Sequence, residues 1–445
     1  MQFQTYEKYK PSEIDWLGDI PKDWQIKRLK DFGRGIIGMV YSPIDIVDSD
    51  REGMLVLRSS NIQNGKISFF DNVYINKRIP QRMTTRCGDI LICSRNGSRA
   101  LIGKNICINK DSEGYTFGAF MTIFRSKSSK FLSFFFNSQL FDYQSGAFMT
   151  STINQLTIGT LHDLVVVAPI IKNDQIAIGN YLKDRTALVD KKIELLDNKK
   201  IKYTELKQNL INEVVTKGLN KKVEMKNSGI EWVGLIPKRW EVKRLKDLGI
   251  VSTSSIDKKV VDEEDLIKLV NYIDVYNNPK KEIKNSEDYM MVSANKKQVF
   301  GKNLKMGDVL FTPSSETMED IGVSAVVMED LKNTLYSYHI LRLRFSVKVN
   351  NYFKKYLFNN FFVQYYFSKS AKGTTRQILG LSTFDNLKVF VPVDEKEQIA
   401  IANYLDEKTG KIDKIINTID KNIKVLQEFR KTLINDVVTG KVKAI

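Results

Sequence analysis

The chain carries Gln175-Ile176-Ala177-Ile178-Gly179-Asn180-Tyr181-Leu182 and, much later, Gln398-Ile399-Ala400-Ile401-Ala402-Asn403-Tyr404-Leu405. The two stretches differ at one position and lie 398 − 175 = 223 residues apart. A duplication with so long a period indicates two copies of one structural unit. We therefore expect a molecule with pseudo-two-fold internal symmetry and a partner that is itself in two parts.

A second motif is repeated at a different distance. It consists of two tryptophans around an Ile-Pro pair: Trp16, Ile20-Pro21 and Trp24, then Trp232, Ile236-Pro237 and Trp240. Here the offset is 232 − 16 = 216, which is 7 less than in the first motif. The ends of the unit are thus shared while its middle has gained and lost residues. This pattern predicts one fold that carries two different specificities.

Composition narrows the class of partner. The chain has 445 residues, enough for about two to four domains, and a formal net charge of +17 that is spread along its length. Distributed positive charge attracts polyanions, so nucleic acid is the first expectation and an anionic membrane surface the second. A basic charge that only maintains solubility is the third.

Cysteine usage and hydropathy bear on location. The three cysteines Cys87, Cys93 and Cys107 lie in the first copy only, which does not suggest a disulfide framework. We see neither a signal segment nor an apolar run of about 20 residues. The sequence predicts a cytoplasmic protein that does not enter membranes.

The middle of each copy favours β-structure. Glycine-aspartate turns precede the apolar runs 90–93 and 309–311, and further strands are expected at 164–167 and 387–391, before Pro169 and Pro392. Aromatic-rich segments at 131–143 and 352–367 are each interpreted as a helix packed on the sheet. Their rings could instead stack on bases, but core packing is the favoured interpretation.

After each proline the apolar positions step alternately by four and by three residues, which is the heptad pattern of a coiled coil. The seam comprises Leu182, Thr186, Val189, Ile193, Leu196, Lys200, Tyr203, Lys207, Leu210 and Val214, and then Leu405, Thr409, Ile412, Ile416, Ile419, Ile423, Leu426, Arg430, Leu433 and Val437. A helix over 172–217 would be roughly 65 Å long. Two equal seams can bury each other; the alternative is an amphipathic helix lying on its own domain. Lys207 and Arg430 must snorkel, find acidic partners or mark a point where the helices splay.

This ordered combination of repeats resembles the specificity (S) subunits of type I restriction–modification systems. The resemblance covers essentially the whole chain and rests on three segments: Glu397–Asp406, the closing run Leu433–Gly440 with its echo at 210–216, and the repeated tryptophan motif. One departure is Asp174-Gln175, where the family usually has Glu-Gln. This departure preserves the charge.

The resemblance implies an α+β fold with two mixed, β-rich target-recognition domains, each followed by a long helix, the two helices pairing as an antiparallel coiled coil. It places recognition domains at 1–170 and 223–393, and helices at 171–222 and 394–445. Each recognition domain would read one half of a bipartite double-stranded DNA sequence, and the coiled coil would set the spacing. Two modification (methyltransferase) subunits and, through these, restriction subunits would dock on it in a system that defends against foreign DNA.

No catalytic constellation is visible in the chain. It lacks a dinucleotide-type glycine loop, a phosphate-binding loop and an amino-methylation motif; Asn278-Pro279 is followed by two lysines, which excludes the last. Its two histidines, His162 and His339, are not equivalent, and the acidic run 262–265 is more typical of an exposed loop than of a metal site. We predict a non-catalytic subunit without cofactor or metal. S-adenosylmethionine, ATP and Mg would then be bound by the partners.

Candidate DNA contacts lie in polar and basic loops between the expected strands, since arginine reads guanine, Asn and Gln read adenine, and Lys, Ser and Thr grip phosphates. They are Arg58, Ser60, Asn61, Arg95, Asn96, Ser98 and Arg99 in the first copy, and Asn271, Tyr272, Ser314, Ser315, Thr317, Lys372, Thr374, Thr375, Arg376 and Gln377 in the second. The loop after the glycine-aspartate strand is basic in the first copy and carries Glu316 in the second, so different half-sites are expected. For any single residue, ordinary turn chemistry remains an alternative.

Two other functions remain open at this stage. One is a basic coiled-coil scaffold that binds anionic surfaces, or a DNA-binding protein without restriction–modification partners. The other is a single-chain nuclease or methyltransferase, which the missing catalytic motifs disfavour.

Overall fold

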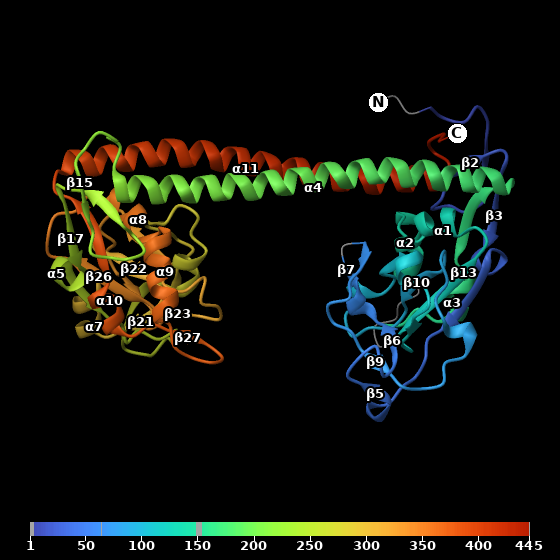
Figure 1. Ribbon diagram of the computed structural model, residues 1–445, viewed down its shortest axis with the longest axis horizontal. Coiled ribbons are helices and arrows are strands. Elements are labelled where there is room, and N and C mark those ends of the chain that lie inside the picture. Colours follow the sequence, from blue (N-terminus) through green and yellow to red (C-terminus); the bar gives the residue numbers. More distant parts are fainter. Residues whose placement is uncertain (1–3, 64, 148–153, 445) are drawn as a thin grey trace. The chain divides into compact units, whose positions relative to one another are not determined.

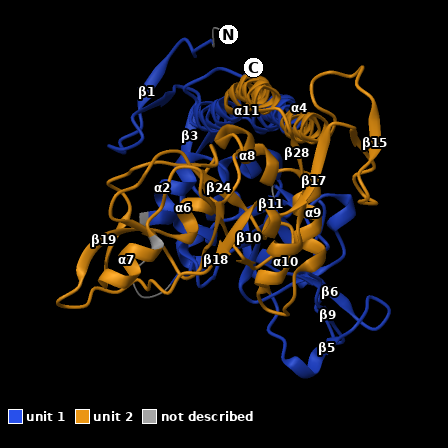
Figure 2. Cartoon of the chain, turned by 90° about the vertical axis from the view of Figure 1, so that its left-hand side faces the viewer, with its two compact units in different colours: residues 1–197, 420–445 blue, residues 198–419 orange. Residues whose placement is uncertain are grey.

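A computed structural model describes residues 4–63, 65–147 and 154–444 (Figure 1). The chain divides into two compact units, residues 1–197 with 420–445 and residues 198–419 (Figure 2). This division passes through both long helices, so each unit is one β-rich domain together with a segment of each helix. None of the helices within these described ranges is long and apolar enough to cross a membrane.

The first unit is built on a four-stranded antiparallel sheet. The strands of the whole unit, in this sheet and outside it, are β1 (Tyr9–Pro11), β2 (Asp19–Pro21), β3 (Trp24–Arg28), β4 (Gly33–Ile37), β5 (Ile46–Val47), β6 (Met54–Leu57), β7 (Ile62–Gln63), β8 (Lys66–Ile67), β9 (Tyr74–Ile75), β10 (Ile90–Cys93), β11 (Asn105–Cys107), β12 (Thr116–Phe117), β13 (Met121–Ser126) and β14 (Val165–Pro169). The order in the main sheet is β11-β10-β13-β4, and a second sheet has the order β12-β6-β9-β5. The helices are α1 (Ser129–Phe135), α2 (Gln139–Ala147), α3 (Ile158–Asp163) and the start of α4 (Lys172–Lys217).

The second unit repeats this plan with one strand more in its main sheet. Its strands are β15 (Met225–Asn227), β16 (Leu235–Pro237), β17 (Trp240–Arg244), β18 (Gly249–Ser252), β19 (Asp265–Val270), β20 (Glu282–Ile283), β21 (Met290–Ala294), β22 (Val309–Phe311), β23 (Ser314–Ser315), β24 (Ser324–Val327), β25 (Thr334–Tyr336), β26 (Leu341–Phe345), β27 (Gln377–Ile378) and β28 (Lys388–Pro392). The main sheet has the order β18-β26-β22-β24-β20. The helices are α5 (Leu245–Leu248), α6 (Tyr272–Tyr276), α7 (Lys296–Lys302), α8 (Asn351–Phe358), α9 (Phe361–Ser370), α10 (Leu381–Asn386) and α11 (Glu395–Val438), the last of which ends in the first unit.

The register of the two main sheets is the same. Ile90 pairs with Phe124 and with Cys107 in the first unit, and Val309 pairs with Leu343 and with Val326 in the second. The offsets 309 − 90, 343 − 124 and 326 − 107 all equal 219. The strands expected at 90–93 and 309–311 are thus confirmed, and this offset makes every position of one sheet comparable with the other.

The repeated sequence motifs meet at the start of each long helix. Trp24 pairs with Pro169 across β3 and β14, and Trp240 pairs with Pro392 across β17 and β28. The buried amide of Gln175 donates to the carbonyl of Pro169 at 2.8 Å, and Gln398 donates to Pro392 at the same distance. The motif is therefore repeated because it fastens each helix to its own domain.

The expected helices at 131–143 and 352–367 are wrong in one respect, because each is two short helices. In the second unit Asn359 ends the first helix and Asn360 begins the next, since the Asn360 side-chain oxygen accepts from the backbone N–H of both Phe362 and Val363. In the first unit the break lies at 136–138, between α1 and α2. The core role predicted for the aromatic rings is confirmed: the fully buried ones include Phe131, Phe135, Phe136, Phe141, Phe353 and Phe367.

The predicted seam is confirmed along both long helices. Every one of its positions is buried or half-buried, whereas most flanking positions are exposed. Two of the seam cations have acidic partners: Arg430 Nε lies 2.8 Å from Asp190 Oδ1, and Lys207 Nζ lies 2.7 Å from Asp413 Oδ1. Position 190 meets 430 while position 207 meets 413, so the helices run antiparallel. The two pairs are themselves equivalent, since 430 − 207 = 413 − 190 = 223.

Candidate nucleic-acid interface

In the first unit, the end of β10 and the start of β13 present a charged and an aromatic side chain together. The backbone N–H groups of Ser94 and Arg95 both donate to the carbonyl of Phe120 at 3.0 Å. The Ser94 hydroxyl, itself buried, also donates to this carbonyl and accepts from Thr122. This scaffold places the exposed Arg95 guanidinium 5.3 Å from the centroid of the Phe120 ring.

The two candidate loops of the first unit lie side by side. Asn96 is half-buried, and its amide donates to the hydroxyl of Ser59 at 3.4 Å, which joins loop 94–99 to loop 58–61. Ser98 and Arg99 are exposed. A third segment, absent from the sequence prediction, joins them because Arg95 forms an isolated antiparallel bridge with Gln155.

Within loop 58–61 the structure limits which residues can act as readers. Asn61 is fully buried; its side chain accepts from the Arg58 N–H at 2.9 Å and donates to the Ser68 carbonyl at 2.9 Å. The turn itself uses this amide, and the base contact expected of Asn61 stays a prediction. Arg58 is half-exposed and paired with Asp71 at 2.8 Å, and Ser60 is half-buried.

The candidate loops of the second unit also converge. Ser314 pairs with Ile378 and Ser315 with Gln377 across β23 and β27, which brings loops 312–317 and 372–377 together. Arg376 Nε donates to the Ser314 hydroxyl at 3.2 Å. Of the predicted contacts on this surface Thr317, Lys372, Thr374, Thr375 and Arg376 are exposed, as is the neighbouring Glu316.

Three other predicted contacts of the second unit, Ser315, Gln377 and Asn271, are buried, and the base contacts expected of them stay predictions. Gln377 donates to the carbonyl of Gly373 at 2.9 Å, and the Ser315 hydroxyl accepts from the Thr317 N–H at 3.3 Å, so both hold their loops. Asn271 is buried at the position before α6. Tyr272 is half-buried and stacks on Tyr276 with ring centroids 5.3 Å apart.

Aromatic residues at the start of the central strands were missed by the sequence prediction. Phe120 is 58% exposed although it directly precedes the buried strand residue Met121, and Tyr338, between β25 and β26, is 48% exposed. The half-buried His339 ring lies 3.9 Å from the Tyr338 ring, centroid to centroid. Burial lowers the pKa of His339, and the positive charges of Arg376 and Lys258 lower it further. A signal existed in the sequence: each aromatic residue precedes the strand that pairs with the glycine-aspartate strand.

The glycine-aspartate motif has a structural role that its sequence did not disclose. Asp89 forms a bidentate ion pair with Arg125, with N–O distances of 2.8 and 2.6 Å. Asp308 and Arg344 repeat it with the same distances. Hydrogen bonding to Asp308 raises the pKa of Arg344. These two arginines thus brace the sheets and are not free for a ligand.

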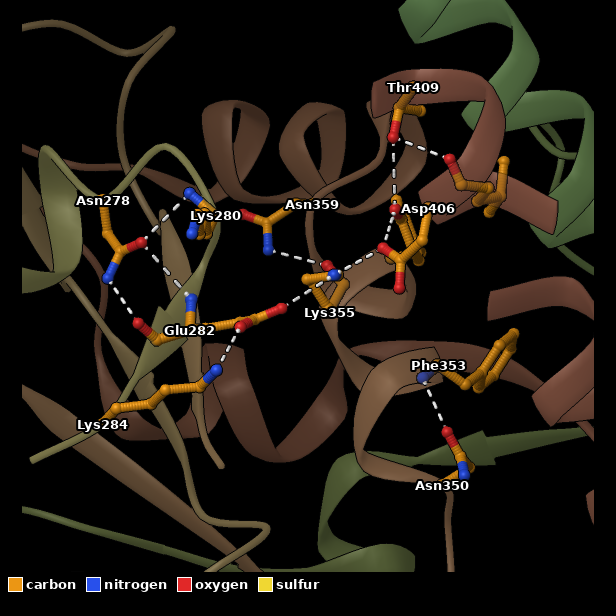
Figure 3. A network of polar contacts seen from close by, with 12 residues as sticks. Asn278, Lys280, Glu282, Lys284, Asn350, Phe353, Lys355, Asn359, Asp406 and Thr409 are labelled. Atoms are coloured by element: carbon orange, nitrogen blue, oxygen red, sulfur yellow. Dashed lines mark hydrogen bonds and ion pairs between the residues drawn. The ribbon is translucent and has the colours of Figure 1, made fainter. Parts of the chain in front are cut away.

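Among the described residues of the second unit, a dense ionic network joins the β-rich domain to a long helix (Figure 3). Lys355 of α8 lies 2.6 Å from Asp406 of α11 and 3.1 Å from Glu282 of β20. The Tyr356 hydroxyl also donates to Asp406. The first unit has Ser133 at the place of Lys355, since 355 − 133 = 222 and 353 − 131 = 222 for the buried phenylalanines beside them. Within the described ranges no three His, Cys, Asp or Glu side chains are placed to hold a metal ion.

Known proteins share this organisation. Residues 237–425 match the sequence profile of the type I restriction modification DNA specificity domain. Over 469 aligned residues the chain is 25% identical to the MjaX protein of Methanocaldococcus jannaschii, which bears the name of a type I restriction enzyme specificity subunit. That alignment covers 100% of this chain and 98% of the relative. The chain therefore contains a type I restriction modification DNA specificity domain and is similar over its whole length to a protein named as a type I specificity subunit.

Two solved structures share the fold of this chain. A chain from a study of complex assembly and conformational transition of the type I R-M system has a TM-score of 0.69 at 14% identity, and the match covers 94% of this chain and 98% of that one. The HsdS subunit from Thermoanaerobacter tengcongensis has a TM-score of 0.50 at 14% identity, with 99% and 100% covered. The predicted α+β fold, with two β-rich domains and paired long helices, is confirmed.

Proposed function

We propose that this specificity subunit reads a bipartite double-stranded DNA sequence, one half through each β-rich domain. The observation that carries the proposal is the contrast within the repeat. The main sheets share their register at an offset of 219, but the loops at one end of them, 94–99 and 312–317, carry different polar residues. A constant frame with variable exposed loops is what reading two unlike half-sites requires.

The chain itself acts as a non-catalytic assembly subunit. Two modification subunits bind it, and restriction subunits join through them. S-adenosylmethionine, ATP and Mg belong to these partners. The match of residues 237–425 to the type I DNA specificity domain and the absence of nucleotide-binding motifs in the sequence support this assignment.

Methylome sequencing tests the reading function. The full chain is co-expressed with its cognate modification subunit in a host that lacks other methyltransferases, and modified bases are mapped across the genome. The expected result is methylation at one split sequence, and none when either subunit is omitted. Methylation that is random in sequence would exclude a specificity role and favour a basic scaffold.

A second experiment tests whether the helices set the spacing. One heptad is deleted from each long helix, residues 195–201 and 419–425, which shortens the pair by about 10 Å, the length of about three base pairs. Both half-sites should be kept while the spacer between them becomes shorter. A change in the half-site sequences, with the spacer unaltered, would contradict the ruler function.

A further inference from the structure

The shared register allows the exposed ends of the two main sheets to be compared residue by residue. Adding 219 to Phe120 gives His339, and adding it to Arg95 gives Ser314. An aromatic ring therefore stands at the same place before the central strand in both units. At the place of the arginine, however, the second unit has a serine.

In the first unit Arg95 packs against an aromatic ring and has no ion-pair partner among the described residues. Its guanidinium lies 5.3 Å from the Phe120 ring centroid, and no ion pair between the described residues engages it. Stacking on an aromatic face fixes a guanidinium plane without using its N–H donors. Arg95 thus keeps its donors free for an acceptor outside the chain.

In the second unit an arginine reaches the same place from another loop. The pairing of β23 with β27 carries Arg376 beside Ser314, and its Nε donates to the Ser314 hydroxyl at 3.2 Å. Arg376 is exposed and, among the described residues, has no acidic partner. Different segments therefore supply an exposed arginine at corresponding places of the two units, β10 with its following loop in the first and the loop before β27 in the second.

We propose that Arg95 and Arg376 each read a guanine, one in each half-site, and that the Phe120 ring and the Ser314 hydroxyl position them. This inference rests on the proposed function and names the residues that determine its specificity. A planar guanidinium with free donors matches the O6 and N7 acceptors that guanine presents in the major groove. A phosphate contact would use the same charge but would carry no sequence information.

The test uses the full chain with its modification subunits and methylome sequencing. Arg95→Ala should relax one guanine position in one half-site, by about tenfold to a hundredfold in discrimination, and leave the other half unchanged. Arg376→Ala should do the same in the other half only. Arg95→Lys, which keeps the charge but loses the bidentate fork, should relax the same position. Arg51→Ala, at an exposed turn of the first unit, is the matched control and should change nothing.

Two outcomes would overturn the inference. Suppose that the Arg95→Lys complex methylates the same sequence as the unaltered complex, while Arg95→Ala weakens methylation at all sites without relaxing any position. The arginine then contacts phosphate. If either single variant alters both half-sites, the assignment of one arginine to each half is wrong. These results differ from failure of the proposed function, in which the unaltered complex itself would show no split sequence.

A second measurement covers variants that lose activity altogether. The unaltered complex is bound to duplexes in which each guanine of its target is replaced in turn by 7-deazaguanine, which removes the N7 acceptor. One replacement in each half-site should weaken binding by about tenfold. If a half-site holds no guanine whose replacement matters, the arginine of that unit is not a guanine reader.

Discussion

Replacing Asp406 with Asn should loosen the recognition domain of the second unit from its helix. The carboxylate accepts from Lys355 Nζ at 2.6 Å and from the Tyr356 hydroxyl. The equivalent position in α4 is Lys183, because 406 − 183 = 223, and the serine that replaces Lys355 in the first unit cannot form such an ion pair. The expected effect is therefore confined to the second unit.

The size of the effect follows from the burial of the charges. The side chains of Lys355 and Glu282 are 10% and 14% exposed, while that of Asp406 is 37% exposed. Removing one partner of a buried pair costs about 3–5 kcal/mol. Glu282 remains beside Lys355, and solvent screens Asp406, so we expect about 2 kcal/mol. An opening equilibrium shifted by this amount speeds amide exchange about 30-fold.

Hydrogen exchange with mass spectrometry measures the change locally. Peptides that cover α8 should exchange about 30-fold faster in Asp406→Asn, while those that cover α1 in the first unit stay unchanged. Lys183→Gln is the matched control at the equivalent helix position and should leave both unaffected. Lys355→Met should also speed exchange in α8, and the double variant should cost less than the sum of the two single changes.

Two results would refute this reasoning. A change of less than about threefold in α8 would mean that the network contributes little to stability. Equal acceleration in α1 and α8 would mean that the two units respond together, so that the network is not a local fastening.

Three further predictions concern stability. Asp89→Asn and Asp308→Asn each break a bidentate pair with a nearly fully buried carboxylate, so each should destabilise its own unit by about 3 kcal/mol. Hydrogen exchange of β10 and of β22 measures this, and loss of protection in both units from one change would contradict it. Burial lowers the pKa of Lys354 to about 8 from its usual 10.5, so between these values the unfolded chain binds more protons than the folded one. The stability of the second unit should therefore gain a contribution as pH rises through this window, which Lys354→Met should abolish; parallel denaturation curves for both proteins would exclude it. Gly440→Ala should cost more than about 1 kcal/mol, because φ is +76° and a new Cβ would lie 2.4 Å from a proline ring atom. Gly218→Ala, with φ +70° and its nearest neighbour at 3.2 Å, should cost less, and equal melting temperatures for the two variants would contradict this difference.

Several features of the fold could be predicted because they depend on short-range patterns. The seam positions follow from the heptad spacing, and the glycine-aspartate strands follow from a turn next to an apolar run. The single helices expected over the aromatic segments were wrong because Asn360 caps a new helix within one of them. When a segment is assigned from its apolar periodicity, the helix boundary signalled by a single capping asparagine within it is easily overlooked.

The candidate interface could be predicted only in part. The loops with Arg95 and Arg376 were identified from their composition, but composition cannot separate an exposed reader from a buried turn residue such as Asn61 or Gln377. Phe120 was overlooked because a lone aromatic residue beside a strand usually belongs to the core. Its exposure follows from the position of the strand end, which only the sheet register fixes.

By itself, the sequence determined that one unit occurs twice and that two equal seams join the copies, because repeats and heptads are written into the order of residues. The tertiary structure alone decided which side chains share a place at the sheet ends. There Arg376 stands beside the serine that replaces Arg95, although 376 − 314 = 62 residues separate the arginine from that serine. The physical reason is that strand pairing between β23 and β27 joins distant segments, and the pairing partner of a two-residue strand cannot be deduced from its own sequence.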